Sequence, residues 1–284
     1  MRHHRPSLLP RRRTGERARR LAVLAFFLTC ISVFAVNLPR WTEPFEVGAA
    51  LWASLQFTLL LMSILLAHEW GHVFVARRHR FRLGLPWFVP FPLWFGTMGA
   101  ILVPRESPRD RDALAQMGAA GPLAGAVCVL AVWVGLFAWG EPQAPVAEDW
   151  RLARPLLWRV LAWLFGTGAA GPSMRDPVAL AGWIGCLVTA MNLLPFGQLD
   201  GGHVFSAHFP RWARWGTGGV TGLLLVAGAF WPGWLVWVVL LYFVGSRRPI
   251  RARDEARPPG KTAKQMGWAC LALFILCAMP VPFS

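Results

Sequence analysis

The chain has 284 residues, of which 55% are hydrophobic and only 15% are charged. A soluble domain usually carries about 25% charged residues, so this composition excludes an ordinary soluble, secreted or disordered chain. The formal net charge of +15 does not indicate nucleic-acid binding, because the basic residues fall in short runs between apolar segments. That distribution is typical of a multi-pass membrane protein with positive loops on one side.

The first 20 residues (1–20) form a basic tail, and residues 21–36 are uncharged. A basic run before a short apolar run can also be a secretory signal peptide, but no small-residue cleavage motif precedes a polar region here. We therefore predict a first membrane-spanning helix whose N-terminus lies in the cytoplasm.

Further apolar segments have close to the ~20 residues that are needed to cross the hydrocarbon core. In chain order they cover residues 48–76, 113–140, 177–195 and 266–280. Residues 216–245 are ambiguous, because Trp231-Pro232-Gly233 interrupts them. They could form one long crossing, but a hairpin of two helices keeps both flanking arginine clusters on one side of the membrane, as the positive-inside rule favours.

Together the segments predict an all-α, multi-pass membrane protein with about six to seven transmembrane segments. We expect the basic loops to face the cytoplasm (77–82, 105–111, 211–214 and 247–264) and the loops 37–47 and 141–176 to face out. The five cysteines lie in apolar stretches without CxxC spacing, which indicates buried small side chains rather than disulfides or a thiolate metal site.

Residues 84–104 are apolar, but their four prolines forbid a continuous helix. Aromatic and β-branched residues between the prolines favour short extended pieces, and Thr97 to Val103 is a proline-free run suited to a strand. We predict a small membrane-inserted β or re-entrant element. The alternative is an interfacial loop whose tryptophans lie at the level of the lipid headgroups.

The second apolar segment contains the sequence His68-Glu69-Trp70-Gly71-His72. On a helix His68 and His72 share a face, so both imidazoles can reach one Zn²⁺, with Glu69 beside it as a general base. Ionisable groups inside a membrane segment are costly and by default mark a function. The alternative, polar residues at a helix end near the interface, does not require this spacing.

A catalytic zinc ion takes three protein ligands and keeps one position open. Most other histidines and acids lie in the basic tail, in an arginine run or in loops that are predicted to face out. The exception is Asp200, at the cytoplasmic end of the fourth segment, where two following glycines permit a tight turn. Its carboxylate comes from the same membrane face as His68 and His72, so we predict Asp200 as the third ligand.

The two motifs, HEWGH and NLLPFGQLDGGH (residues 192–203), resemble those of the site-2 protease family of intramembrane zinc metalloproteases. Two glycine-rich stretches, 96–100 and 118–125, are similar to segments of its prokaryotic members. The resemblance runs from about Leu61 to His203, and the occurrence of both motifs in this order is highly specific.

This resemblance implies roles for five residues. His68, His72 and Asp200 would bind one zinc ion, and Glu69 would be the catalytic base. Asn192 matches a family asparagine that supports the substrate or the transition state. The region 84–104 would present the substrate as an extended chain.

The apolar segments, the charge pattern and the resemblance together predict how the chain is organised. Residues 21–245 would form an intramembrane protease core, 246–265 a cytoplasmic linker and 266–284 a C-terminal transmembrane segment. The expected activity is a zinc-dependent endopeptidase that cleaves membrane proteins in or near their transmembrane segments. Its expected surroundings are the lipid bilayer of a cell membrane, in a bacterium, with the N-terminus and active site toward the cytoplasm.

Two other functions remain open at this stage, a metal transporter and a non-catalytic scaffold descended from a protease. A transporter usually offers several aligned sites, whereas the polar residues here gather at one end of the membrane. The intact set of predicted metal ligands and general base, His68, Glu69, His72 and Asp200, speaks against a scaffold. The Gly121-x-x-x-Gly125 pattern indicates helix packing rather than chemistry, and His203 and Gln198 stay undecided as assisting residues.

Overall fold

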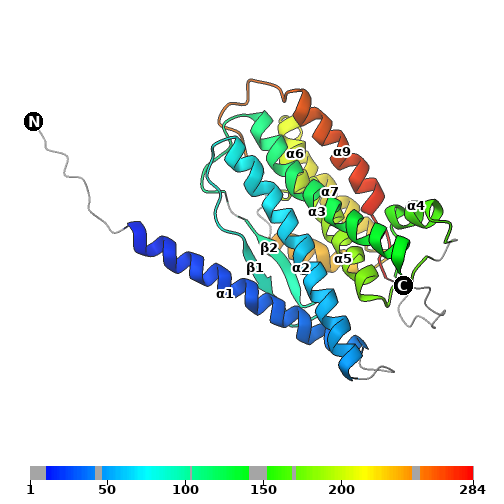
Figure 1. Cartoon of the computed structure of the whole chain (residues 1–284). Helices are drawn as coiled ribbons and strands as arrows, with labels where there is room; N and C mark the ends of the chain where they lie inside the picture. The colour runs from blue at the N-terminus through cyan, green and yellow to red at the C-terminus, as the bar shows by residue number, and fades with distance from the viewer. Residues whose placement is uncertain are drawn as a thin grey trace, which may run out of the picture.

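The computed structural model describes residues 11–41, 47–102, 104–140, 152–167, 171–244 and 250–283. In this part of the chain, three helices are long and apolar enough to cross a membrane. They are α1 (Arg11–Asn37), α2 (Val47–Arg78) and α3 (Arg111–Trp139), and α2 packs along α3 (Figure 1). The mostly helical membrane fold is confirmed, whereas a count of six to seven crossings stays a prediction.

Four shorter helices correspond to the other predicted segments: α5 (Pro177–Asn192), α7 (Ala213–Ala227), α8 (Gly233–Val244) and α9 (Lys261–Cys277). Helix α5 has Pro177 in its first turn, where the missing N–H costs nothing. The Asp176 carboxylate caps this end by accepting hydrogen bonds from the N–H groups of Val178 and Ala179. Helix α9 begins at Lys261, five residues before the predicted apolar segment. The hydropathy pattern missed this beginning because the first turn of the helix is polar.

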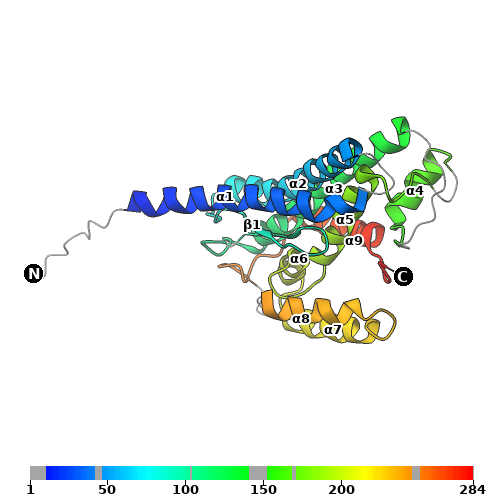
Figure 2. The same ribbon diagram turned by 90° about the horizontal axis from the view of Figure 1, so that it is seen from below.

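Helices α7 and α8 form a hairpin that lies as a separate layer against the rest of the molecule (Figure 2). The chain leaves α7 at Gly228 and enters α8 at Gly233, and Pro232 between them lacks the N–H that a continuing helix needs. Across the hairpin, Thr221 Oγ1 and the Tyr242 hydroxyl lie 3.1 Å apart. The predicted break at residues 231–233 is confirmed, while the number of membrane crossings in this hairpin stays a prediction.

One short helix, α4 (Leu156–Leu164), lies in the stretch 141–176, for which only a loop was expected. Its nine residues are too few for a membrane crossing, so a search for long apolar segments does not find it. The buried ring of Trp158 contacts the rings of Trp133 and Phe137 of α3, at centroid distances of 4.9 and 4.7 Å. Residues 141–151 and 168–170 of this stretch lie outside the described residues.

The predicted β element is a hairpin of two short antiparallel strands, β1 (Trp87–Pro90) and β2 (Thr97–Ile101). Trp87 pairs with Ile101 and Phe88 with Ala100, before the register becomes irregular toward Pro90. Strand β1 lies along α1, and β2 also contacts α2. The strand prediction is confirmed in its position, although β2 ends at Ile101 and Val103 lies outside the described residues.

The core lies where α2, α3 and α5 meet, and it contains the fully buried indoles of Trp133, Trp158 and Trp183. Two of them donate their N–H to backbone carbonyls: Trp133 to Ala179 (3.2 Å) and Trp183 to Ala153 (2.7 Å). All five cysteines are free and buried or partly buried, as their apolar surroundings predict.

The contact between α3 and α5 requires a glycine at position 182. A β-carbon at Gly182 would overlap the Trp133 indole, so we expect Gly182→Ala to lower the free energy of unfolding by about 1–3 kcal/mol, as overpacked cores do. Gly135→Ala is the matched control on α3, because a β-carbon there meets only Trp139, at 4.0 Å. Thermal unfolding of both variants in detergent checks this, and equal stabilities of the two would contradict the packing argument.

Candidate metal centre

The two histidines of the HEWGH sequence lie one helical turn apart on α2 and point toward the same neighbour. Their ring centroids are 5.0 Å apart. His68, Glu69 and His72 are all buried, although each carries a polar group inside an apolar helix. Burial without compensation would destabilise the fold, so these side chains need polar partners.

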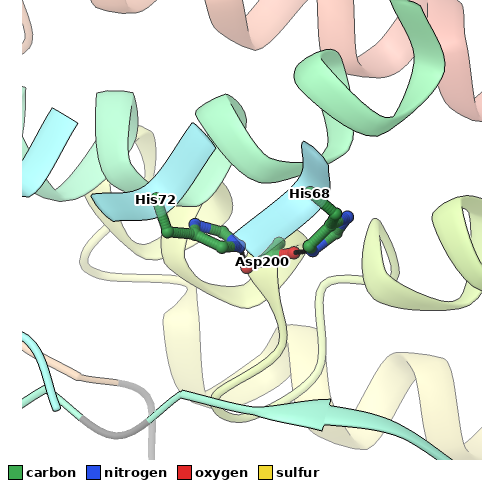
Figure 3. A group of neighbouring side chains, drawn as sticks. All are labelled: His68, His72 and Asp200. Carbon is green, nitrogen blue, oxygen red and sulfur yellow. Dashed lines mark ion pairs between the residues drawn. The ribbon is translucent and has the colours of Figure 1, made fainter. Parts of the chain in front are cut away.

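Asp200, at the start of α6 (Asp200–His208), is the partner of both histidines (Figure 3). Its Oδ2 lies 3.0 Å from His68 Nε2, and its Oδ1 lies 3.3 Å from His72 Nε2. Within the described residues, these three form the one group of at least three His, Cys, Asp or Glu side chains whose ligand atoms all lie within 4.8 Å of one another. The structure thus brings together the three residues that the sequence singled out as metal ligands.

The distances within this cluster fit a tetrahedral metal ion. Zinc bonds of about 2.0–2.2 Å to nitrogen and oxygen place neighbouring ligand atoms about 3.3 Å apart. Each histidine Nε2 has one Asp200 oxygen at a comparable distance, Oδ2 at 3.0 Å for His68 and Oδ1 at 3.3 Å for His72, and one ligand atom from each of the three residues lies within 4.8 Å of the others. Burial alone would raise the pKa of the Asp200 carboxyl, but the nearby imidazoles of His72 and His68 lower it below its ordinary value. The carboxylate is therefore held in the charged form that a cation prefers.

The orientation of His72 is fixed by its second ring nitrogen. His72 Nδ1 lies 2.8 Å from the carbonyl oxygen of Met117 on α3, so a proton on Nδ1 is donated to that oxygen. This tautomer leaves the Nε2 lone pair directed at the cluster, as in metal-binding histidines whose other nitrogen has a hydrogen-bond acceptor. No feature of the sequence identifies Met117, because the group that acts is its backbone carbonyl.

Gly121 on α3 allows that helix to approach the His72 ring, whereas a side chain at Gly125 would make only an ordinary contact with His68. A β-carbon at Gly121 would overlap the His72 ring, and one at Gly125 would lie 3.4 Å from the His68 Cβ. In the other direction, a β-carbon at Gly71 would overlap the Ala120 carbonyl. The Gly121-x-x-x-Gly125 pattern therefore packs α3 against α2, as predicted, and this packing shapes the wall of the site.

Glycines also place Asp200. A β-carbon at Gly201 would overlap the Leu193 carbonyl, and one at Gly202 would lie 2.5 Å from the Gly197 oxygen. On the opposite side, a β-carbon at Gly118 of α3 would come within 2.7 Å of the Asp200 carbonyl oxygen. The first turn of α6 is thus held between the end of α5 and α3, as the expected tight turn requires.

Glu69 lies beside this cluster without being part of it. Its Oε2 is buried and has no hydrogen-bond partner among the described residues. A buried carboxylate oxygen without a partner is costly, so it calls for a further polar group such as water or a substrate. A general base needs such a carboxylate oxygen, which lies beside the metal ligands and can accept a proton.

The remaining candidates are less directly placed. Asn192 is the last residue of α5 and is partly buried, and no described hydrogen bond links it to the cluster. Gln198 is exposed. His203 is buried on α6, its Nδ1 has no described partner, and burial lowers the pKa of this imidazole to about 4. His203 is therefore a neutral side chain near Asp200 and not a member of the cluster.

The sequence was compared with known families and proteins. Residues 56–217 match peptidase family M50. The chain is 32% identical over 234 residues to the probable zinc metalloprotease EGY2, chloroplastic, of Arabidopsis thaliana, covering 80% of this chain and 42% of that protein. It is 30% identical over 244 residues to the probable zinc metalloprotease EGY1, chloroplastic, of the same plant, covering 81% and 43%.

The chain spans less than half the length of these curated relatives. No solved structure matches it. The matched stretch 56–217 nevertheless contains every member of the cluster, as well as Glu69 and Asn192. It also covers more than half of the chain, which therefore belongs to peptidase family M50, as its resemblance to the site-2 proteases indicated.

Proposed function

We propose that this protein is an intramembrane zinc-dependent endopeptidase, which hydrolyses peptide bonds in or near the transmembrane segments of membrane proteins. The observation that carries this proposal is that Asp200 of α6 meets His68 and His72 beside the unpartnered Glu69 oxygen, and that these last three residues lie on a helix long enough to cross a membrane. The names of the relatives, probable zinc metalloproteases, support the choice of metal and reaction.

His68 Nε2, His72 Nε2 and one Asp200 carboxylate oxygen would hold the zinc ion. When bound, zinc acts as a Lewis acid on a carbonyl group and lowers the pKa of water at the site toward ~7. The Met117 carbonyl keeps His72 in the tautomer that this role needs. Three protein ligands leave a fourth position open, as in catalytic rather than structural zinc sites.

Glu69 would act as the general base. Its free Oε2 would accept a proton from the attacking water and pass that proton to the nitrogen of the leaving amine. Asn192, at the end of α5, would donate a hydrogen bond to the oxygen on which negative charge develops, a contribution of roughly 3 kcal/mol where it has been measured. These roles need no other charged residue near the cluster.

The β1–β2 hairpin would bind the substrate. A peptide bond inside a helix is shielded by hydrogen bonding, so a transmembrane substrate must unwind before cleavage. An extended segment could pair with the edge of a strand and recover its backbone hydrogen bonds there. The contact of strand β2 with the helix of His68 and His72 supports this role.

The charge distribution supports an orientation. The basic loops would lie in the cytoplasm together with the N-terminus and the site, in a bacterial cell membrane. We retain residues 1–20 as a cytoplasmic tail, 21–245 as the protease core, 246–265 as a cytoplasmic linker and 266–284 as a C-terminal transmembrane segment. Residues 1–10 and 245–249 lie outside the described part.

The two alternative functions are less well supported. A metal transporter would offer a series of sites, whereas one candidate group is found in the described part of the chain. A scaffold would not need a buried carboxylate oxygen without a partner beside the metal-binding residues, since that oxygen only costs stability.

Zinc binding should depend on each of the three ligands. We expect His68→Ala, His72→Ala and Asp200→Ala to lose most of the metal from purified protein, because two donors alone bind far more weakly. His79→Ala is the matched control, since His79 directly follows the end of α2 but its Nε2 lies 3.1 Å from Gln116 Oε1 and not in the cluster. Elemental analysis measures the metal, and full zinc content in Asp200→Ala would reassign the third ligand.

Glu69→Gln should keep the metal and greatly lower the rate of peptide hydrolysis. The amide has the same size but accepts no proton, and loss of a general base typically lowers a rate ~10²–10⁴-fold. The comparison needs single-turnover cleavage of a transmembrane substrate together with zinc analysis of the same sample. Cleavage by the Gln variant at the wild-type rate would contradict the mechanism.

A proline in β2 should impair substrate binding without loss of metal. Ile101 is the last residue of β2 and pairs with Trp87, and proline there removes a backbone donor. We expect Ile101→Pro to slow cleavage, while Ile101→Ala, which keeps the N–H, remains close to wild type. Equal cleavage by both variants, at normal zinc content, would assign the hairpin to membrane anchoring alone.

A further inference from the structure

The turn between β1 and β2 is bound to the C-terminal end of α1, far from the metal cluster in sequence. Asn37, the last residue of α1, is completely buried. Its Nδ2 donates one hydrogen bond to the Val33 carbonyl (2.8 Å) and a second to the carbonyl of Phe95 in the turn (3.0 Å). One amide thus joins α1 to a residue 58 positions away.

The neighbours of Asn37 determine which way its amide points. Its Oδ1 accepts a hydrogen bond from Arg40 Nε at 2.8 Å. Both groups near the nitrogen are carbonyl oxygens and the group near the oxygen is a donor, so the reversed amide would place like groups together. No aliphatic or acidic side chain can make the same set of contacts.

Arg40 adds a second link to the same turn. Its Nη2 donates to the Trp94 carbonyl at 3.0 Å, and its guanidinium carbon lies 5.4 Å from the centre of the Phe95 ring. Arg40 therefore stabilises the orientation of Asn37 and also binds the turn directly, at the Trp94 carbonyl and the Phe95 ring. Together the two side chains form a clasp, which we define as Asn37 and Arg40.

The shape of the turn itself depends on the contact with α1. Trp94 and Gly96 have positive φ values of 57° and 88°. A β-carbon at Gly96 would lie 2.7 Å from the Val33 nitrogen, so only glycine permits this approach. Two backbone bonds, Phe91 N to Gly96 O (3.1 Å) and Gly96 N to Leu93 O (3.0 Å), close the turn.

We infer that the clasp of Asn37 and Arg40 positions the hairpin for substrate, so that both are positioning residues of the proposed protease. A two-stranded hairpin is marginally stable by itself and needs external support to hold one register. The turn is fastened to α1 while β2 contacts α2, so the clasp sets how β2 lies relative to the helix of the metal cluster. This inference rests on the proposed function of the hairpin.

The first test measures the hairpin without any reaction. In full-length zinc-loaded protein, Asn37→Asp keeps the size of the side chain but cannot donate to Val33 and Phe95. We expect hydrogen–deuterium exchange of the peptides covering residues 87–101 to become about tenfold faster, in line with the loss of one to two net hydrogen bonds. Arg40→Met is the second variant, and it should have a smaller effect of the same kind.

Thr29→Val is the matched control. Thr29 is also a completely buried polar residue of α1, but its hydroxyl donates to Ala25 within the same helix, so its described hydrogen bond does not involve the hairpin. Exchange in residues 87–101 should be unchanged in this variant. Equal acceleration in Thr29→Val and Asn37→Asp would show general loosening of α1 and overturn the clasp.

The second test measures the reaction. We expect Asn37→Asp to raise KM for a transmembrane substrate about tenfold while kcat stays within about twofold and zinc content is unchanged, the signature of lost substrate binding. Faster exchange with an unchanged KM would overturn the positioning role and leave the protease itself in place. Absence of cleavage by the wild-type enzyme would instead contradict the proposed function, a result distinct from either outcome for the clasp.

Discussion

The close approach of α2 and α3 is the constraint on which the metal centre depends. Glycines on both helices make this approach possible, because a β-carbon at Gly71 or Gly121 would overlap Ala120 or His72. The same approach brings the Met117 carbonyl to His72 Nδ1, which fixes the imidazole tautomer. A slightly wider helix pair would break this hydrogen bond and leave a polar ring unsatisfied inside an apolar bundle. Packing and chemistry are therefore set by the same small residues.

The metal cluster and the hairpin proposed to bind substrate come from three separate parts of the chain, and each part is held in place by different contacts. His68 and His72 are placed by helical spacing, whereas Asp200 is placed by the close contacts of Gly201 and Gly202. The hairpin is placed by the buried amide of Asn37. The last two have one property in common, which is that backbone groups are approached closely, by glycines in one case and by a buried amide in the other. Such contacts suit a protein whose outer surface is apolar, because hydrophobic burial gives little direction to packing within lipid.

Much of this arrangement could be predicted from the sequence, for identifiable reasons. The spacing of His68 and His72, the scarcity of other acids near Asp200 and the prolines of residues 84–104 are all local signals. Helix α4 escaped prediction because nine residues produce no hydropathy signal. The contacts of Met117 and Asn37 escaped it because they join residues 45 and 58 positions apart through backbone carbonyls, which every residue carries. Sequence patterns identify side chains, but not the backbone groups that orient them.

The distance along the chain between the two halves of the metal cluster has a consequence for maturation. His72 and Asp200 are separated by about 130 residues, and closing a loop of that length restricts the unfolded chain far more than the folded one. In the proposed enzyme, a bound ion would therefore act as a cross-link as well as a catalyst. A newly made chain that had not yet acquired its ion would lack this link between α2 and α6. The supply of zinc would then decide how much of the protein survives cellular quality control, and not only how much of it is active.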